Sequence, residues 1–180
     1  MDAILRIDTL ALNWIYKTTR SRLGDKVMPI ISYTGNLGGI WVLSFAFLYL
    51  SRISKACART GMIALLFSAL LINLLLKNLF RRRRPFESCS KYNTIIDEPK
   101  DFSFPSGHTF SSFAAATVIF SFLPIAGMIA ITYATLIAFS RLYLCVHYVS
   151  DVVFSMVLSV SLTILLLHIL IHGQMLQPEP

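Results

Sequence analysis

Long stretches without a charged residue constrain the fold of this chain more than any other feature. Residues 27–51 and residues 102–140 contain no Asp, Glu, Lys or Arg. These runs of 25 and 39 residues are long enough to cross a hydrocarbon core of about 30 Å once and twice, respectively. Hydrophobic residues make up 56% of the chain and charged residues only 14%, which is too apolar for an ordinary soluble domain. The sequence therefore predicts an all-α membrane protein whose helices form a polytopic bundle.

The apolar runs predict five transmembrane helices. Pro124 and Gly127 divide the longer uncharged run, because both residues favour turns. The first run contains Gly35 and Gly39 in a GxxxG arrangement, which we interpret as a packing feature only. Because the chain has no internal repeat, residues 1–180 are expected to form a single membrane-embedded domain. The expected spans are residues 27–51, residues 60–76 with a helical extension to residue 80, and residues 105–123, 125–143 and 147–170.

Residues 1–26 precede the first expected span. Polar residues recur at helical spacing across residues 2–17, with apolar residues between them. This pattern is typical of an amphipathic helix in the membrane interface, and a helix packed on the bundle without a lipid role explains it equally well. Residues 18–26 are expected to form a basic linker. The polar positions of the helix are Asp2, Arg6, Thr9, Asn13 and Lys17.

The charge balance is basic, with 16 Lys and Arg against 9 Asp and Glu and a formal net charge of +7. Such an excess suits nucleic acid, anionic lipid or a phosphate-bearing substrate, and the hydropathy argues against nucleic acid. The cysteines Cys57, Cys89 and Cys145 form neither a CxxC pair nor a zinc-type cluster, so no disulfide, metal site or cofactor is predicted. The expected partners are a membrane lipid and the bilayer, with no obligatory protein partner.

Residues 77–104 form the longest polar connection in the chain and are expected to be a loop. Counted from the N-terminus, two crossings return the chain to its starting side at this loop, and two more return it there at residues 141–151. The polar residues that are unusual in so apolar a chain therefore lie on one face of the membrane. We expect one composite site there, built from the ends of spans two to five.

Three polar clusters reach that face, and each has an ordinary structural explanation. Arginines at a membrane boundary are usually a topology signal, Pro-Ser-Gly before an apolar run is a common helix start, and a boundary histidine is often a satisfied interface residue. Charged groups in a membrane are costly, however, so the convergence of all three favours a function. The clusters are Lys77 with Arg84-Pro85, residues 105–108, and Ser140-Arg141 with His147 and Asp151.

Together the clusters contain the parts of a phosphoryl-transfer site. Lys and Arg donate charge-assisted hydrogen bonds to phosphate oxygens, and Ser106 and Gly107 at a helix start offer a hydroxyl and free N–H groups. His147 and Asp151 are four residues apart, so on a helix the carboxylate can hold one imidazole nitrogen while the other faces outward. Two histidines suit in-line displacement, in which one attacks phosphorus and the other protonates the leaving oxygen.

The spacing of these residues resembles the three-part signature of the type 2 phosphatidic acid phosphatase superfamily. Lys77 is separated by six residues from Arg84-Pro85, and PSGH occupies residues 105–108. Ser140-Arg141 is followed after five residues by His147, and after three more by Asp151. All three parts match. The superfamily includes bacterial membrane lipid phosphatases and, more distantly, vanadium haloperoxidases.

The resemblance implies a role for each residue. His147 would be the nucleophile and form a phosphohistidine, Asp151 would orient it, and His108 would protonate the leaving group and later activate water. No metal is required in this family. Arg81, Arg82 and Arg83 lie outside the signature and receive no role from it. The phosphate would be held by Lys77, Arg84, Ser106, Gly107 and Arg141.

The implied activity is hydrolysis of a phosphate or pyrophosphate monoester of a lipid. Undecaprenyl pyrophosphate and phosphatidylglycerophosphate are favoured over lipid A as substrates, although the motif residues would contact only the phosphate, which all these lipids share. The alternative is a transporter or flippase of an anionic lipid, which leaves the pairing of His147 with Asp151 unexplained. A haloperoxidase fits poorly, because those relatives are typically soluble. Since one histidine must be neutral and the other protonated, we expect a bell-shaped pH profile.

Two signals disagree about the side of the membrane that carries the site. Thirteen Lys and Arg lie on the site's side against three on the other, and the positive-inside rule then places the site in the cytoplasm. Phosphate binding accounts for several of these residues, however, and the resemblance implies an extracytoplasmic site. We expect a multi-pass protein of the cell membrane with an extracytoplasmic active site.

Overall fold

The computed structural model describes residues 2–89, 91–92 and 94–172. Every regular element among these residues is helical, which confirms the predicted all-α class. The elements are α1 (Asp2–Thr19), α2 (Arg22–Thr34), η1 (Asn36–Gly38), α3 (Gly39–Leu50), α4 (Lys55–Leu70), η2 (Leu71–Leu76), α5 (Lys77–Phe80), α6 (Pro85–Ser88), α7 (Gly107–Phe122), α8 (Pro124–Tyr143) and α9 (Val149–His172).

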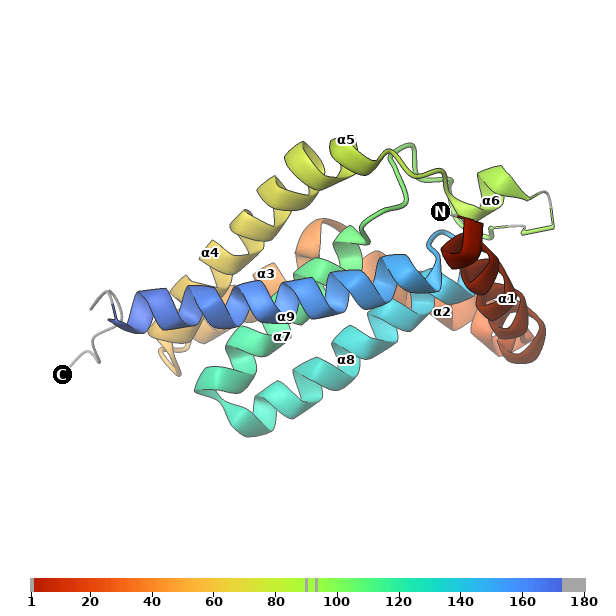
Figure 1. Cartoon of the computed structure of the whole chain (residues 1–180). Coiled ribbons are helices and arrows are strands. Elements are labelled where there is room, and N and C mark those ends of the chain that lie inside the picture. The colour runs from red at the N-terminus through yellow and green to blue at the C-terminus, as the bar shows by residue number, and fades with distance from the viewer. Residues whose placement is uncertain (1, 90, 93, 173–180) are drawn as a thin grey trace.

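Helix α7 lies at the centre of the bundle and packs against α4, α8 and α9 (Figure 1). Three consecutive alanines, Ala114 to Ala116, are buried on α7 and let the neighbouring helices approach closely. Helix α1 lies across one end of the bundle, against α8 and α9, and α6 lies at the same end (Figure 1). The polar connection after α5 and the N-terminal helix therefore meet at one end of the molecule.

Three helical stretches are long and apolar enough to cross a membrane, namely residues 55–88, 124–143 and 149–170. The bent pair of α2 and α3 makes a fourth if it is one span. Helix α7 has 16 residues, which at about 1.5 Å per residue is shorter than a hydrocarbon core of about 30 Å. The multi-pass membrane protein is confirmed, and the number of five spans stays a prediction.

The first expected span, residues 27–51, is broken, and the prediction of one continuous helix there was wrong. Helices α2 and α3 meet at an angle of 52° through the 3₁₀ turn η1. Gly38 has φ +68°, a conformation that glycine adopts at little cost, and Leu37 before it has φ +53°. Leu37 and Gly38 therefore bend the chain within this run.

Gly35 has a packing role at the break, as the GxxxG interpretation expected. A Cβ atom at this position would lie 3.0 Å from Cδ2 of His108 and 3.2 Å from a methyl group of Ile137. A side chain at this position would force these two neighbours to shift, so glycine suits this close approach. The break thus brings the end of α2 against the start of α7.

The amphipathic helix α1 fits both interpretations of its sequence. Asp8, Leu12 and Ile15 are buried against the bundle, since positions spaced by four and three residues share one face. Apolar side chains on other faces, such as Leu10 and Trp14, remain exposed at 70% and 67%. Helix α1 therefore packs on the bundle and still presents apolar surface outward, as an interfacial helix does.

The basic linker expected at residues 18–26 is largely helical, so this prediction was wrong. Helix α1 continues to Thr19, and α2 begins at Arg22. Ser21 caps α2, because its hydroxyl accepts a hydrogen bond from the Gly24 N–H at 3.0 Å. Only two residues separate the helices.

The second span extends helically to Phe80, as predicted, and then enters the expected loop. Before α5, the span contains the wide π-helical turn η2, which ends directly before Lys77. Such turns are frequent at functional sites. Arg81, with φ +45°, ends the helix. The loop of residues 77–104 is partly helical, because it begins with α5 and contains α6.

The turn predicted near Pro124 and Gly127 is present. Helix α7 ends at Phe122, and Pro124 begins α8, where its missing N–H costs nothing. A Cβ on Gly127 would lie 2.1 Å from Cα of Phe120, so only glycine fits where α8 crosses the end of α7. This tight hairpin holds the two helices together along their length.

Candidate active site

A cavity of about 550 Å³ lies between α2, η1, α4, the polar loop and the start of α7. Two of the eight predicted site residues, Ser106 and Asp151, are fully buried behind its wall. Apolar residues of α4 and η2, including Leu65 and Ile72, line another part of the wall. The structure thus brings the three sequence clusters to one cavity. The other six predicted residues lie on its wall: Lys77, Arg84, Gly107, His108, Arg141 and His147.

His147 occupies the tight connection between α8 and α9, where Cys145 adopts φ +54°. Its Nδ1 lies 2.7 Å from the carbonyl oxygen of Ser103. A carbonyl oxygen only accepts, so Nδ1 carries the proton, and Nε2 keeps its lone pair in the neutral ring. Nε2 lies 3.3 Å from Nη1 of Arg84 on the cavity wall. The nitrogen that can attack a phosphorus atom therefore faces the cations.

The surroundings of His147 favour its neutral form. Burial, followed by the positive charges of Arg84, Arg141 and Lys77, lowers the pKa of His147 well below its ordinary value. The side chain is 1% exposed, so water screens these charges little. The imidazole is neutral at neutral pH, as a nucleophile requires.

Asp151 does not bond the imidazole directly, which corrects the sequence prediction. Its Oδ2 lies 3.7 Å from Nδ1 of His147, too far for a hydrogen bond. Oδ2 instead accepts from the hydroxyl of Ser103 at 2.5 Å and from the N–H of Tyr148 at 2.8 Å. Ser103 therefore stands between the two residues, because its hydroxyl binds Asp151 and its carbonyl binds His147. Asp151 is therefore linked to the imidazole of His147 through Ser103.

Lys77 and Arg84 share one carboxylate, that of Asp101. Lys77 pairs with Asp101 Oδ2, and Arg84 Nη2 lies 2.5 Å from Oδ1. Arg84 also donates from Nε to the Asp101 carbonyl at 2.8 Å and from Nη1 to the Val146 carbonyl at 2.6 Å. Burial alone would raise the pKa of Asp101, but the pairing with Lys77 and Arg84 outweighs it and holds that pKa far below its usual range. An anion thus already sits between two predicted phosphate ligands.

Arg141 is the third cation of the cavity and is 3% exposed. Its Nη1 donates to the hydroxyl of Ser32 on α2. Its Nε is buried and has no hydrogen-bond partner among the described residues. A buried donor without a partner costs free energy, so this N–H is suited to an anion that enters the cavity.

At the start of α7, Gly107 lines the cavity, whereas Ser106 is buried behind the wall. Ser106 is fully buried; its N–H donates to the hydroxyl of Ser155 at 2.8 Å, and its hydroxyl accepts from Thr109 at 3.0 Å. This N–H is therefore not free for an anion, whereas the hydroxyl keeps its own hydrogen, and phosphate binding by Ser106 stays a prediction. Gly107 lines the cavity, and a Cβ there would lie 3.9 Å from Nζ of Lys77. The first N–H groups of a helix have no partner within it, so the first turn of α7 provides donors beside Lys77.

His108 lies on the cavity wall, on the first turn of α7. Its Nε2 is 2.8 Å from Oδ1 of Asn36, the first residue of η1. An amide oxygen only accepts, so Nε2 carries a proton. The break in the first span therefore supplies the partner of the predicted acid.

A family model described as PAP2 superfamily matches residues 58–172. This chain belongs to the PAP2 superfamily. All eight predicted site residues fall within the matched region, and the resemblance inferred from the motifs is confirmed. The chain is accordingly a metal-independent lipid phosphatase of the membrane.

Two solved structures show the same bundle. The transmembrane PAP2-type phosphatidylglycerolphosphate phosphatase from Bacillus subtilis is 23% identical, with a TM-score of 0.76 over 100% of this chain and 90% of that chain. LpxE from Aquifex aeolicus is 27% identical, also with a TM-score of 0.76, over 89% of this chain and 94% of that chain. Both similarities extend beyond the three motifs to the fold as a whole.

Four residues of the PAP2 site were missed by sequence reasoning. Ser103 and Asp101 are ordinary loop residues in sequence, although they lie only two and four residues before Pro105 of the PSGH motif. Ser32 and Asn36 lie within an apolar run that was assigned only to membrane crossing. Each is a single polar residue without a repeating pattern, so no local signal marks it. Their proximity to the motif was the one available hint, and it applies to Ser103 and Asp101 alone.

Proposed function

We propose that the chain hydrolyses a phosphate or pyrophosphate monoester of a membrane lipid through a phosphohistidine at His147. The observation that carries this proposal is the His147 imidazole, whose Nδ1 is held by the Ser103 carbonyl while Nε2 faces the cations of the cavity. A neutral, oriented imidazole beside Arg84 is what attack on an anionic phosphoryl group requires.

In the first step, the lone pair on Nε2 of His147 attacks phosphorus, and the bond from phosphorus to the leaving oxygen breaks. His108, in its protonated imidazolium form, donates its Nε2 proton to that oxygen, in place of the hydrogen bond to Asn36, and becomes neutral. In the second step, water attacks the phosphohistidine, His108 takes a proton from the water, and the bond from Nε2 to phosphorus breaks. Inorganic phosphate is released, the neutral imidazole of His147 is regenerated, and His108 is protonated again.

The cations and the start of α7 stabilise the transition state. Arg84, Arg141 and Lys77 carry fixed positive charge, and the N–H groups at the start of α7 add the positive end of a helix dipole. The unpartnered Nε of Arg141 gains a hydrogen bond only when an anion is present. Interactions made only with the reacting phosphate are those that raise kcat.

The favoured substrates are undecaprenyl pyrophosphate and phosphatidylglycerophosphate. The Bacillus subtilis enzyme of the same fold is a phosphatidylglycerolphosphate phosphatase. The apolar wall formed by Leu65, Ala69 and Ile72 adjoins the cations, so a lipid can place its apolar part beside the phosphate site.

Phosphate release by purified protein in detergent, with EDTA present, tests this proposal. The substrate panel contains undecaprenyl pyrophosphate, phosphatidylglycerophosphate, phosphatidate and lipid A, and His147→Ala is the matched variant. We expect turnover that His147→Ala abolishes and that EDTA leaves unchanged. Absence of turnover by folded wild-type protein on every lipid would contradict the proposal. No observation favours the transporter considered from the sequence.

We propose that the active site is extracytoplasmic, in line with the family resemblance. Cys89 is exposed in the loop at the active-site end, whereas Cys57 and Cys145 are buried, so an impermeant thiol reagent reports on Cys89 alone. Labelling of intact cells is expected, with Cys89→Ser as the control that removes it. Labelling only after permeabilisation would contradict the proposal.

A further inference from the structure

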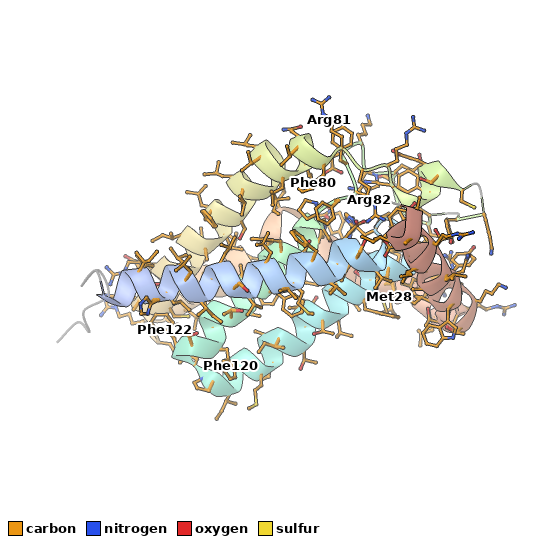
Figure 2. All side chains as sticks on the ribbon, in the orientation of Figure 1. Met28, Phe80, Arg81, Arg82, Phe120 and Phe122 are labelled. Atoms are coloured by element: carbon orange, nitrogen blue, oxygen red, sulfur yellow. The ribbon has the colours of Figure 1, made fainter. Side chains whose placement is uncertain are left out.

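The signature leaves Arg82 without a role, but the structure places it beside Asp151. Figure 2 shows Arg81 pointing away from the bundle and Arg82 turned toward it. The Arg82 side chain is 22% exposed, and its Nη1 lies 2.5 Å from Oδ1 of Asp151. Its guanidinium lies over the ring of Tyr148 at 4.2 Å, which fixes its plane further.

Arg82 also contacts Ser103, the other residue that orients the nucleophile. The carbonyl oxygen of Arg82 accepts a hydrogen bond from the Ser103 N–H at 2.8 Å. Ser103 in turn binds Asp151 through its hydroxyl and His147 through its carbonyl. Arg82 thus holds both groups that set the direction and tautomer of His147.

The last member of this network comes from the N-terminal helix. Asp8 on α1 is 3% exposed, and its Oδ2 lies 2.6 Å from Nη2 of Arg82. Both Asp8 oxygens also accept from Ser150, from its N–H at 2.8 Å and its hydroxyl at 2.6 Å. Ser150 lies in the first turn of α9, where a carboxylate is stabilised by the helix dipole. Asp8 lies outside the residues matched by the family model.

We propose that Arg82 and Asp8 are positioning residues of the phosphatase: Asp8 fixes Arg82, and Arg82 holds Asp151 and Ser103 so that His147 keeps its reactive orientation. This inference rests on the proposed function of His147. The physical reason is that Asp151 is a fully buried carboxylate, which needs a positive partner to stay ionised and in place. Without Arg82, Asp151 and Asp8 would be left as two buried carboxylates near each other.

The kinetic test compares Arg82→Gln, Arg82→Lys, Asp8→Asn and the double variant Arg82→Gln/Asp8→Asn. Arg83→Gln is the matched control, because it removes an exposed arginine next to Arg82. We expect Arg82→Gln to lower kcat about 100-fold with little change in KM, since a misdirected nucleophile reacts slowly although the substrate binds. The kcat of Arg82→Lys is expected to be about ten-fold higher than that of Arg82→Gln. Asp8→Asn alone is expected to lower kcat about ten-fold.

The double variant separates positioning from a purely structural role. Arg82→Gln leaves two unpaired buried carboxylates, and Asp8→Asn removes one of them, so the double variant regains thermal stability. Its kcat is expected to stay at the level of Arg82→Gln. A double variant that regains kcat together with stability, a folded Arg82→Gln protein with wild-type kcat, or an equal loss in Arg83→Gln would overturn the proposal.

A spectroscopic measurement tests the inference without turnover. Imidazole ¹⁵N chemical shifts of His147, assigned by comparison with His147→Ala, are expected to show one tautomer with the proton on Nδ1. Arg82→Gln is expected to convert this signal to a mixture of tautomers, and an unchanged signal would overturn the positioning role. If His147→Ala retains turnover while the ¹⁵N signal responds to Arg82→Gln, the proposed chemistry of His147 fails and the positioning network stands.

Discussion

Residues 58–172 and the 57 residues before them contribute to one site in different ways. The matched region holds the groups that would touch the phosphate, including His147, His108 and Arg141. The earlier residues supply their partners: Asp8 binds Arg82, Ser32 binds Arg141, and Asn36 binds His108. The comparison teaches that reactive groups and the groups that orient them can come from separate parts of a chain. Substitutions on the two sides of each contact can therefore measure each contribution.

The largest difference is expected at the contact of His108 with Asn36. His108→Gln should lower kcat about 1,000-fold, because the leaving oxygen loses its proton donor. Asn36→Ala should lower kcat only about ten-fold, since the proton remains and only its direction is lost. Single-turnover phosphate release measures both, with Asn78→Ala as the control, because Asn78 bonds carbonyls of its own helix. Equal losses in both variants would contradict this division of roles.

The contact of Arg141 with Ser32 should show a smaller contrast. Arg141→Lys removes the unpartnered Nε donor and is expected to lower kcat/KM about 100-fold. Ser32→Ala is expected to cost about three-fold, since a guanidinium that loses one neutral partner keeps its charge. Initial rates over a range of substrate concentrations check both values. A Ser32→Ala loss as large as that of Arg141→Lys would show that orientation, not charge, dominates at this cation.

Acid should reduce activity through protonation of His147. Burial lowers the pKa of His147, so the imidazole stays neutral on the acid side of its ordinary range and protonates only as the pH falls through the lowered pKa. We expect the acid limb of kcat/KM below about pH 6.5, with a fall of about ten-fold per pH unit beyond it. A pH profile of the wild type locates the limb. An acid limb above pH 7 would contradict a buried neutral nucleophile.

The smallest effect is expected at Asp101, which belongs to the matched region and yet performs no proposed chemistry. Its carboxylate pairs with Lys77 and Arg84, where a phosphate would bind. Asp101→Asn should therefore tighten inhibition by inorganic phosphate about five-fold, because a neutral amide competes less for the two cations. Product-inhibition assays measure this change, and Asp97→Asn, another carboxylate of the cavity wall, is the control. Weaker inhibition in Asp101→Asn would mean that this carboxylate helps to order the cations.

The sequence was sufficient for features that depend on local pattern. Hydropathy located α8 and α9 to within a few residues: they were expected at residues 125–143 and 147–170 and are found at Pro124–Tyr143 and Val149–His172. Motif spacing identified the residues that line the cavity, because Lys77, Arg84 and His147 belong to a pattern that recurs across a superfamily. Crossing parity then predicted that these residues lie at one end of the bundle.

Only the tertiary structure decided how the site residues pair. The bend at Gly35 to Gly38 looked like part of an unbroken apolar run, and the spacing of four residues between His147 and Asp151 suggested a direct bond that Ser103 in fact mediates. Asp8 is not one of the regularly spaced polar positions of α1. Its carboxylate lies on the buried face of the helix, where a charged group needs a partner. Hydropathy and motifs are properties of neighbouring residues, whereas hydrogen bonds between Asp8, Arg82 and Asp151 join positions far apart in the chain. Such pairings exist only once the helices are packed, which is why the sequence alone did not reveal them.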